Sequence, residues 1–150
     1  MTGLATAPTS AKLRLFVTDD SPDGGSVFKV GNTWTETGIN WANAPAIAGS
    51  SLAAAGATTN GTWVDFDVTS AVTGNGEVSF ALTTTSSNSS YYSSREGANR
   101  PQLVLVGGEA PAALTARGLE TQGIALRSTS LATVKAYCPL PPSRLGTLAA

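Results

Sequence analysis

A chain of 150 residues with 41% hydrophobic residues has room for one ordinary domain with its own core. Only 13% of the residues are charged and the net charge is −1, so the chain lacks the clustered lysine and arginine of nucleic-acid-binding proteins. The absence of histidine excludes Ser-His-Asp and Cys-His catalytic groups and imidazole metal sites, and the single cysteine, Cys138, excludes an internal disulfide. We interpret Cys138 as an incidental thiol rather than a reactive one.

The first predicted strand covers residues 11–18 and follows a small, polar lead over residues 1–10 that we expect to be linker-like. Leu13, Leu15 and Val17 alternate with polar and larger residues, which predicts one buried face. The Asp-, Pro- and Gly-rich residues 19–25 predict a wide turn, and a short strand is expected over residues 27–30.

The middle of the chain is poor in regular patterns. Residues 34–45 predict an irregular loop anchored by Trp34 and Trp41. Residues 46–60 are small and Gly-containing, so we expect mostly loop with one short strand around residues 51–54.

The clearest strand covers residues 63–69, where apolar and polar residues alternate. The Asn75-Gly76 turn signal follows, and alternation resumes over residues 77–83, so these two strands are expected to form a connected pair. A polar loop comes next, and residues 102–106 read as the last strand. Residues 11–106 therefore predict an all-β, antiparallel β-sandwich.

The composition changes after Gly107-Gly108, where residues 107–150 become rich in Ala, Leu, Arg and Pro. Glycine and a proline-rich run interrupt any long helix there. We expect a linker-like or weakly structured extension, with at most a short helix near residues 112–119.

Three groups of segments resemble the DNRLRE-type domain, a family of secreted bacterial modules also classed as carbohydrate-binding module family 96. They are residues 11–19, residues 34–45 with 63–69, and residues 92–98 with 101–105. The resemblance implies a jelly-roll module that binds glycans and does no chemistry, commonly appended to extracellular enzymes or cell-surface proteins. Family members usually have further strands upstream of the Ala11 segment. The fold is therefore expected either to lack N-terminal strands or to be completed by another segment, such as the extension.

Sugar binding needs flat aromatic faces for the apolar side of a pyranose ring and polar groups for its hydroxyls. The candidate rings belong to Trp34, Trp41, Trp63, Tyr91 and Tyr92. Trp34 and Trp41 also suit packed loop anchors, since tryptophan buries a large area. Trp63 is expected on an exposed strand face, and of the consecutive Tyr91 and Tyr92 one should point inward and one outward.

Arg95 is the candidate for a polar clamp, because a guanidinium can hold the carboxylate of a uronic acid in a bidentate manner. The alternative role is structural, as the partner of a carboxylate such as Glu96, Asp65 or Asp67. Asp65 and Asp67 lie on one strand face and are interpreted as a solvated surface rather than a catalytic pair.

Three carboxylates around a Gly-rich turn, Asp19, Asp20 and Asp23, can supply oxygen ligands to a structural calcium ion. Ordinary turn chemistry is the alternative explanation. No other cofactor is expected.

The resemblance, together with these candidate residues, implies a non-catalytic module of an extracellular protein that binds polysaccharide, uronic-acid polymers included, by stacking and polar contacts. An appended enzyme domain is expected in the parent protein, but neither nucleic acid nor membrane as a partner. The chain shows no bilayer-spanning run and no secretion signal of its own. The main alternative is a structural β-sandwich module of a cell-surface or stalk protein, in which the aromatic residues are all buried. A glycoside-cleaving enzyme is least favoured.

Overall fold

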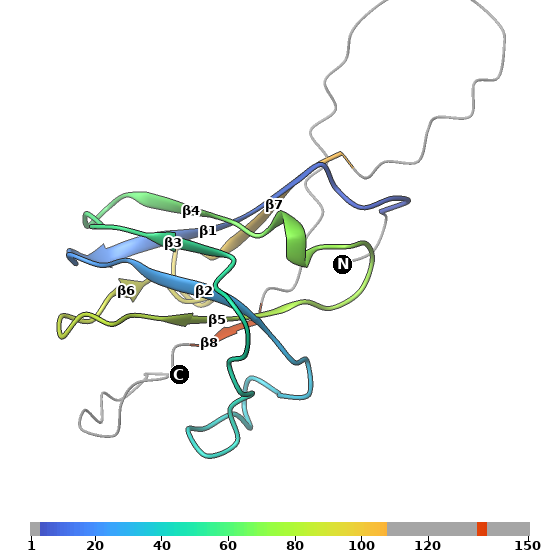
Figure 1. The fold of residues 1–150 in the computed structure, drawn as a ribbon. Helices are drawn as coiled ribbons and strands as arrows, with labels where there is room; N and C mark the ends of the chain where they lie inside the picture. The colour runs from blue at the N-terminus through green and yellow to red at the C-terminus, as the bar shows by residue number, and fades with distance from the viewer. Residues whose placement is uncertain (1–3, 108–134, 138–150) are drawn as a thin grey trace, which may run out of the picture.

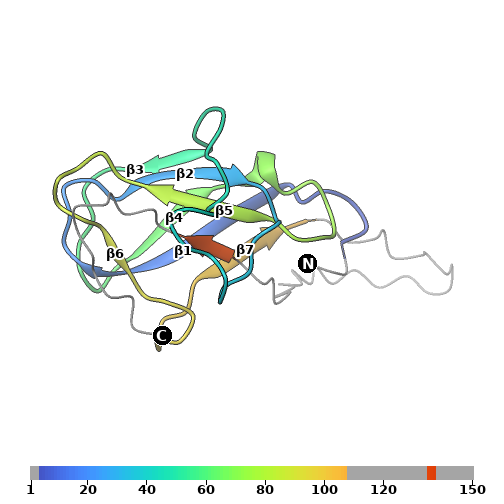
Figure 2. The same cartoon turned by 90° about the horizontal axis from the view of Figure 1, so that it is seen from below.

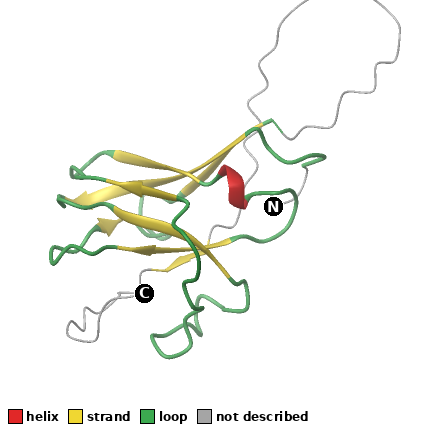
Figure 3. Cartoon of the chain, in the orientation of Figure 1, coloured by secondary structure: helices red, strands yellow, loops and turns green. Residues whose placement is uncertain are grey.

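Two four-stranded sheets make up the part of the chain that this computed structural model describes, residues 4–107 and 135–137. The first sheet holds β4 (Trp63–Asp67), β1 (Ser10–Asp19), β6 (Tyr91–Tyr92) and β7 (Gln102–Val106). The second holds β3 (Ala53–Ala55), β2 (Gly25–Val30), β5 (Ser79–Thr83) and β8 (Lys135–Tyr137). The sheets form two layers (Figures 1 and 2), and the short 3₁₀ helix η1 (Thr69–Ala71) is drawn in red in Figure 3. The predicted all-β sandwich is confirmed.

β1 is the central strand of the first sheet. Its residues 12–16 pair antiparallel with β4 along one edge. Along the other edge its first half, residues 10–14, pairs with β7 and its end pairs with β6. The loop of residues 93–101 leaves this edge next to Phe16, whose carbonyl accepts a 2.8 Å hydrogen bond from the Ser93 amide.

In the second sheet β2 pairs antiparallel with both β3 and β5, and β8 runs parallel to β5 along its outer edge. Residues 135–137 therefore add a strand to the sandwich, which is one of the two outcomes expected from the family resemblance. The helix predicted near residues 112–119 and Cys138 both lie outside the described residues.

The core lies between the sheets and contains the inward members of each alternating strand. Phe66 and Phe80 are at most 1% exposed, and Leu13, Val27 and Val68 pack with them. Each such side chain contributes about 1.5–3 kcal/mol on burial. In β5 the alternation predicts only part of the burial, because Ser79 is also fully buried.

The expected connected pair of strands over residues 63–69 and 77–83 is wrong. β4 pairs with β1 in the first sheet, whereas β5 pairs with β2 in the second. The reason is that η1 begins one residue after β4. Ala71 at its end and Val72 just beyond it are buried, so the chain crosses between the layers before it reaches the Asn75-Gly76 turn.

Part of the lead predicted to be linker-like is held against the sandwich. The Leu4 amide donates to Asn75 Oδ1 at 2.8 Å, and Asn75 Nδ2 donates back to the Leu4 carbonyl at 2.7 Å. The Thr9 amide donates to the Val106 carbonyl at 2.8 Å.

The turn of residues 19–25, hereafter the Asp23 turn, connects the two sheets. The Asp23 carboxylate accepts hydrogen bonds from the Gly25 amide and from the Thr84 hydroxyl, both at 2.8 Å. The Tyr92 hydroxyl donates to the Gly24 carbonyl at 2.7 Å. The turn therefore fixes both the end of β5 and the strand β6.

Candidate functional site

The long loop of residues 31–48, between β2 and β3, carries two of the predicted rings in opposite environments. Trp34 is only 7% exposed and anchors the loop, whereas Trp41 is 60% exposed. The expectation that both tryptophans anchor the loop is therefore right for Trp34 and wrong for Trp41. Local bonds stiffen the turn around Trp41, because Asn40 Oδ1 accepts from the Ala42 amide at 2.9 Å and Asn43 Nδ2 donates to the Gly38 carbonyl at 2.8 Å.

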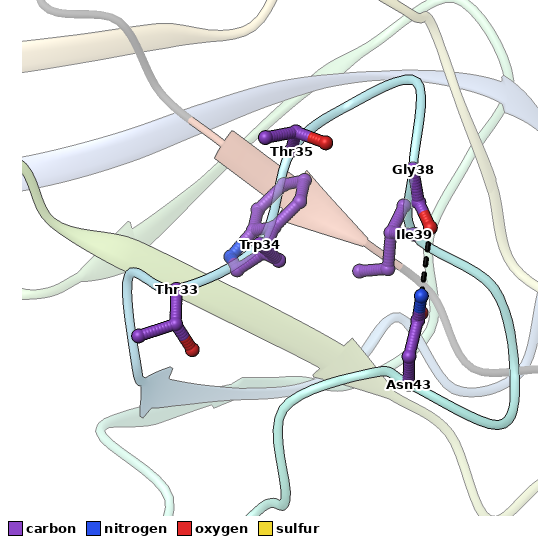
Figure 4. A pocket seen from close by; sticks show the side chains of 6 residues that line it. All are labelled: Thr33, Trp34, Thr35, Gly38, Ile39 and Asn43. Atoms are coloured by element: carbon purple, nitrogen blue, oxygen red, sulfur yellow. Dashed lines mark hydrogen bonds between the residues drawn. The ribbon is translucent and has the colours of Figure 1, made fainter.

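A pocket of about 170 Å³ opens in the same loop (Figure 4). It is lined by two threonines, an asparagine, a glycine and two apolar side chains: Thr33, Thr35, Asn43, Gly38, Trp34 and Ile39. At roughly 30 Å³ for each water of bulk liquid, this volume corresponds to about five or six waters. The mixture of hydroxyl, amide and indole surface suits a small ligand with both polar edges and an apolar face.

Arg95 lies in the loop of residues 93–101 and joins it to the loop of residues 31–48. Its Nη1 lies 2.7 Å from Glu36 Oε2, and its Nε donates to Glu96 Oε1 at 2.9 Å. The hydrogen bond to Glu96, with the charges of both glutamates, raises the pKa of Arg95 further above its ordinary value. Of the three carboxylates considered as structural partners, Glu96 contacts Arg95, whereas Asp65 pairs with Arg14 and Asp67 bonds to Thr69. The second partner, Glu36, lies far away along the chain and could not be predicted from the sequence. We call Trp41, the pocket and this ion pair the loop surface.

Trp63 lies on the outer face of the first sheet, opposite Phe16 in the β1–β4 register. The two rings meet edge to face with centroids 5.3 Å apart, and both side chains are half-buried. The Arg14 guanidinium carbon lies 5.1 Å from the centroid of Trp63, and Arg14 Nε donates to Asp65 Oδ1 at 2.8 Å. We call the group of Arg14, Phe16, Trp63 and Asp65 the sheet face. Sequence reasoning named Trp63 but missed Arg14, which only the register between distant strands brings to it.

The two consecutive tyrosines diverge as predicted. Tyr91 is 54% exposed, whereas Tyr92 is half-buried against the core and its hydroxyl bonds to Gly24. Tyr91 therefore offers a ring to solvent, and Tyr92 holds the Asp23 turn.

The three aspartates considered for calcium have separate partners. Asp19 accepts from the Asp20 amide, Asp20 from the Asn60 amide at 2.6 Å, and Asp23 from Gly25 and Thr84. Across residues 4–107 and 135–137, no three metal-ligating side chains gather into one site. These contacts match ordinary turn chemistry, and the calcium hypothesis stays a prediction that a calcium titration can test.

The described residues form a two-layer sandwich of the β-sandwich class, and one loop of it carries both the exposed Trp41 and a small pocket of mixed polarity. Residues 1–107 match carbohydrate-binding module family 96, and the chain belongs to this family. The match confirms the resemblance noted in the sequence. No curated protein and no solved structure matches the chain.

Within the described part of the chain, no helix is both long enough and apolar enough to span a membrane.

Proposed function

We propose that this carbohydrate-binding module holds polysaccharide at the loop surface without catalysing a reaction. The indole of Trp41 stacks against the apolar face of one sugar ring, and the hydroxyl and amide groups of the pocket bond to the next. The observation that carries the proposal is the 60% exposure of Trp41 in a turn fixed by its own hydrogen bonds.

Preorganisation is the physical reason to favour this site. A ring that is already held in place loses little conformational freedom when a ligand stacks on it. Asn43 belongs both to the turn that carries Trp41 and to the lining of the pocket, so stacking and hydrogen bonding lie within one short segment.

If the polysaccharide contains uronic acid, Arg95 is the residue expected to bind its carboxylate. Both Glu36 and Glu96 contact the Arg95 guanidinium, so their negative charges compete with a ligand carboxylate for it. Glu36→Gln should therefore strengthen binding to a polyuronate and leave binding to a neutral polysaccharide unchanged. If the variant binds both polymers as the wild type does, Arg95 takes no part in recognition.

The contacts of the acidic residues support binding over hydrolysis. Asp65 is paired with Arg14, and Asp67 accepts hydrogen bonds from the amide and hydroxyl of Thr69 at 2.9 and 2.7 Å. Both lie on the exposed outer face of β4, whereas glycoside hydrolysis needs two carboxylates on either side of the scissile bond. The exposed ring of Trp41 likewise argues against a purely structural module in which all aromatic side chains are buried. An extracellular parent protein, with an appended enzyme domain, is part of this proposal.

Affinity gel electrophoresis with soluble neutral polysaccharides and polyuronates tests the proposal. We expect the wild type to be retarded by at least one polymer and Trp41→Ala to bind at least ten-fold more weakly, about 1.4 kcal/mol. Val106→Ala is the matched control, because Val106 is a large apolar residue exposed to 58% on β7. Retardation on no polymer, or equal retardation of Trp41→Ala and the wild type, would contradict the proposal.

A further inference from the structure

We infer that the sheet face is a second saccharide-binding surface, which takes a neutral pyranose with two adjacent free hydroxyls. This inference goes beyond the proposed function, because it assigns a separate site with its own residues. The central groups are Arg14, Trp63 and Asp65.

The sheet register builds the site from two strands. Phe16 and Trp63 are direct cross-strand partners, and so are Arg14 and Asp65. Neighbouring pairs on one face of a sheet lie two residues apart along each strand, so the aromatic pair and the ion pair are adjacent. The 5.1 Å contact between Arg14 and the Trp63 ring joins them into one continuous surface.

Hydrogen-bonding capacity is left over at this surface. Arg14 donates a hydrogen bond from Nε to Asp65, and its two terminal Nη groups donate to no residue in the described ranges. Asp65 Oδ2 accepts no hydrogen bond from any residue that the structure describes, and Lys12 Nζ lies 3.9 Å from it. A guanidinium donor and a carboxylate acceptor therefore stand side by side and part-exposed next to an aromatic pair.

That combination matches a vicinal diol on a pyranose ring. One hydroxyl can accept from Arg14 while its neighbour donates to Asp65, and charged partners make both hydrogen bonds strong. The apolar C–H face of the same ring then has Phe16 and Trp63 beside it.

The charges of this face favour a neutral ligand. Lys12 and Arg14 stand opposite Asp67 and Asp65 in the register, so the two positive and two negative side chains balance. A second copy of this chain is a poor occupant, because a protein surface would strip water from these ion pairs at high cost. Sugar hydroxyls can take over the bonds that water makes there.

The two surfaces lie on different sides of the sandwich. β1 and β4 form one layer, whereas the loop of residues 31–48 extends from β2 in the other layer (Figure 1). One intact chain can therefore hold two polysaccharide strands, and a soluble polymer should be cross-linked by it.

Isothermal titration of the intact chain with neutral hexasaccharides of glucose and mannose tests this inference. We expect two ligands bound per wild-type chain and one in Trp41→Ala, with one also in Arg14→Leu. Asp67→Asn is the matched control on the same strand face and should keep both sites. Light scattering of a neutral polysaccharide should show cross-linking by the wild type and by Asp67→Asn only.

If Arg14→Leu lowers the melting temperature, Asp65→Asn serves as the second variant, because it removes the charged acceptor and changes no volume. One ligand per wild-type chain, or two in both Arg14→Leu and Asp65→Asn, would overturn the second surface. Failure of the loop surface is distinct: Trp41→Ala would then bind like the wild type while Arg14→Leu loses its ligand.

Discussion

The Asp23 turn and the loop of residues 31–48 are both rich in turn-forming residues, but the turn connects several strands whereas the loop carries the candidate binding residues. The Asp23 turn is bonded to β5, to β6 and to the segment after β3, with the Gly24 amide donating to the Gly56 carbonyl at 2.7 Å. The longer loop bonds mainly to itself, and its polar contacts with the rest of the chain include the 2.9 Å hydrogen bond from Asn32 Nδ2 to the Glu77 carbonyl and the surface ion pair of Glu36 with Arg95. Changes in the turn should therefore cost stability, and changes in the loop should cost binding.

Gly25→Ala should produce the largest loss of stability. Gly25 has φ +88°, and an added Cβ would lie 2.6 Å from the Thr83 carbonyl oxygen. Strain in this region and the clash with backbone together should cost about 3 kcal/mol of unfolding free energy in urea titration. Gly49→Ala is the control, since Gly49 has a similar φ of +82° but open space around it. It should cost about 1 kcal/mol, and equal losses would refute the steric part of the explanation.

Asp23→Asn should produce the next largest loss of unfolding free energy, about 1.5 kcal/mol. This value is low for charge-assisted hydrogen bonds, because Asp23 is half-exposed. Hydrogen bonds from the Gly25 amide and then the Thr84 hydroxyl hold the pKa of Asp23 below its ordinary value. The carboxylate therefore stabilises the fold above its ordinary pKa, and this contribution is lost as the pH falls through the lowered folded value. Urea titrations across the acid range should show a flatter pH dependence for Asp23→Asn, and an unchanged slope would contradict this.

Tyr92→Phe should cost about 1 kcal/mol, because it removes the hydroxyl that donates a hydrogen bond to the Gly24 carbonyl and keeps the ring. Tyr91→Phe is its control on the same strand, with a ring 54% exposed. Thermal unfolding should separate the two variants, and identical melting temperatures would mean that the Tyr92 bond adds nothing.

Glu36→Gln should leave the melting temperature unchanged. Its ion pair with Arg95 is exposed on both sides, and such pairs are screened by water and salt. A clear drop in melting temperature, removed by high salt, would show that this ion pair stabilises the sandwich more than its exposure suggests.

Local pattern predicted most of the strands. The alternation around Leu13, Phe66 and Phe80 places each of these side chains in the core, and residues 102–106 match β7 residue for residue. The pairing of the strands was harder to predict. Asn75-Gly76 is a local hairpin signal, whereas the crossover through η1 depends on burial of Val72 in the folded chain.

In the candidate site, too, residue types could be predicted from the sequence but contacts between distant residues could not. Trp41 and Arg95 could be named from residue type, but burial decides which ring reaches solvent, and only the folded chain supplies Glu36 as the partner of Arg95. The role of Arg14 could not be predicted, because no pattern within β1 distinguishes this residue. Its contacts with Trp63 and Asp65 result from the pairing of β1 with β4.

The three indole N–H signals in a nitrogen-proton NMR spectrum test the central claim most directly, because Trp34, Trp41 and Trp63 each give one. On addition of a polysaccharide that retards the chain in gels, the Trp41 signal should shift together with that of Trp34, whose indole lines the pocket, and the Trp63 signal should follow. A Trp41 signal that stays in place while the polysaccharide is bound would contradict the account.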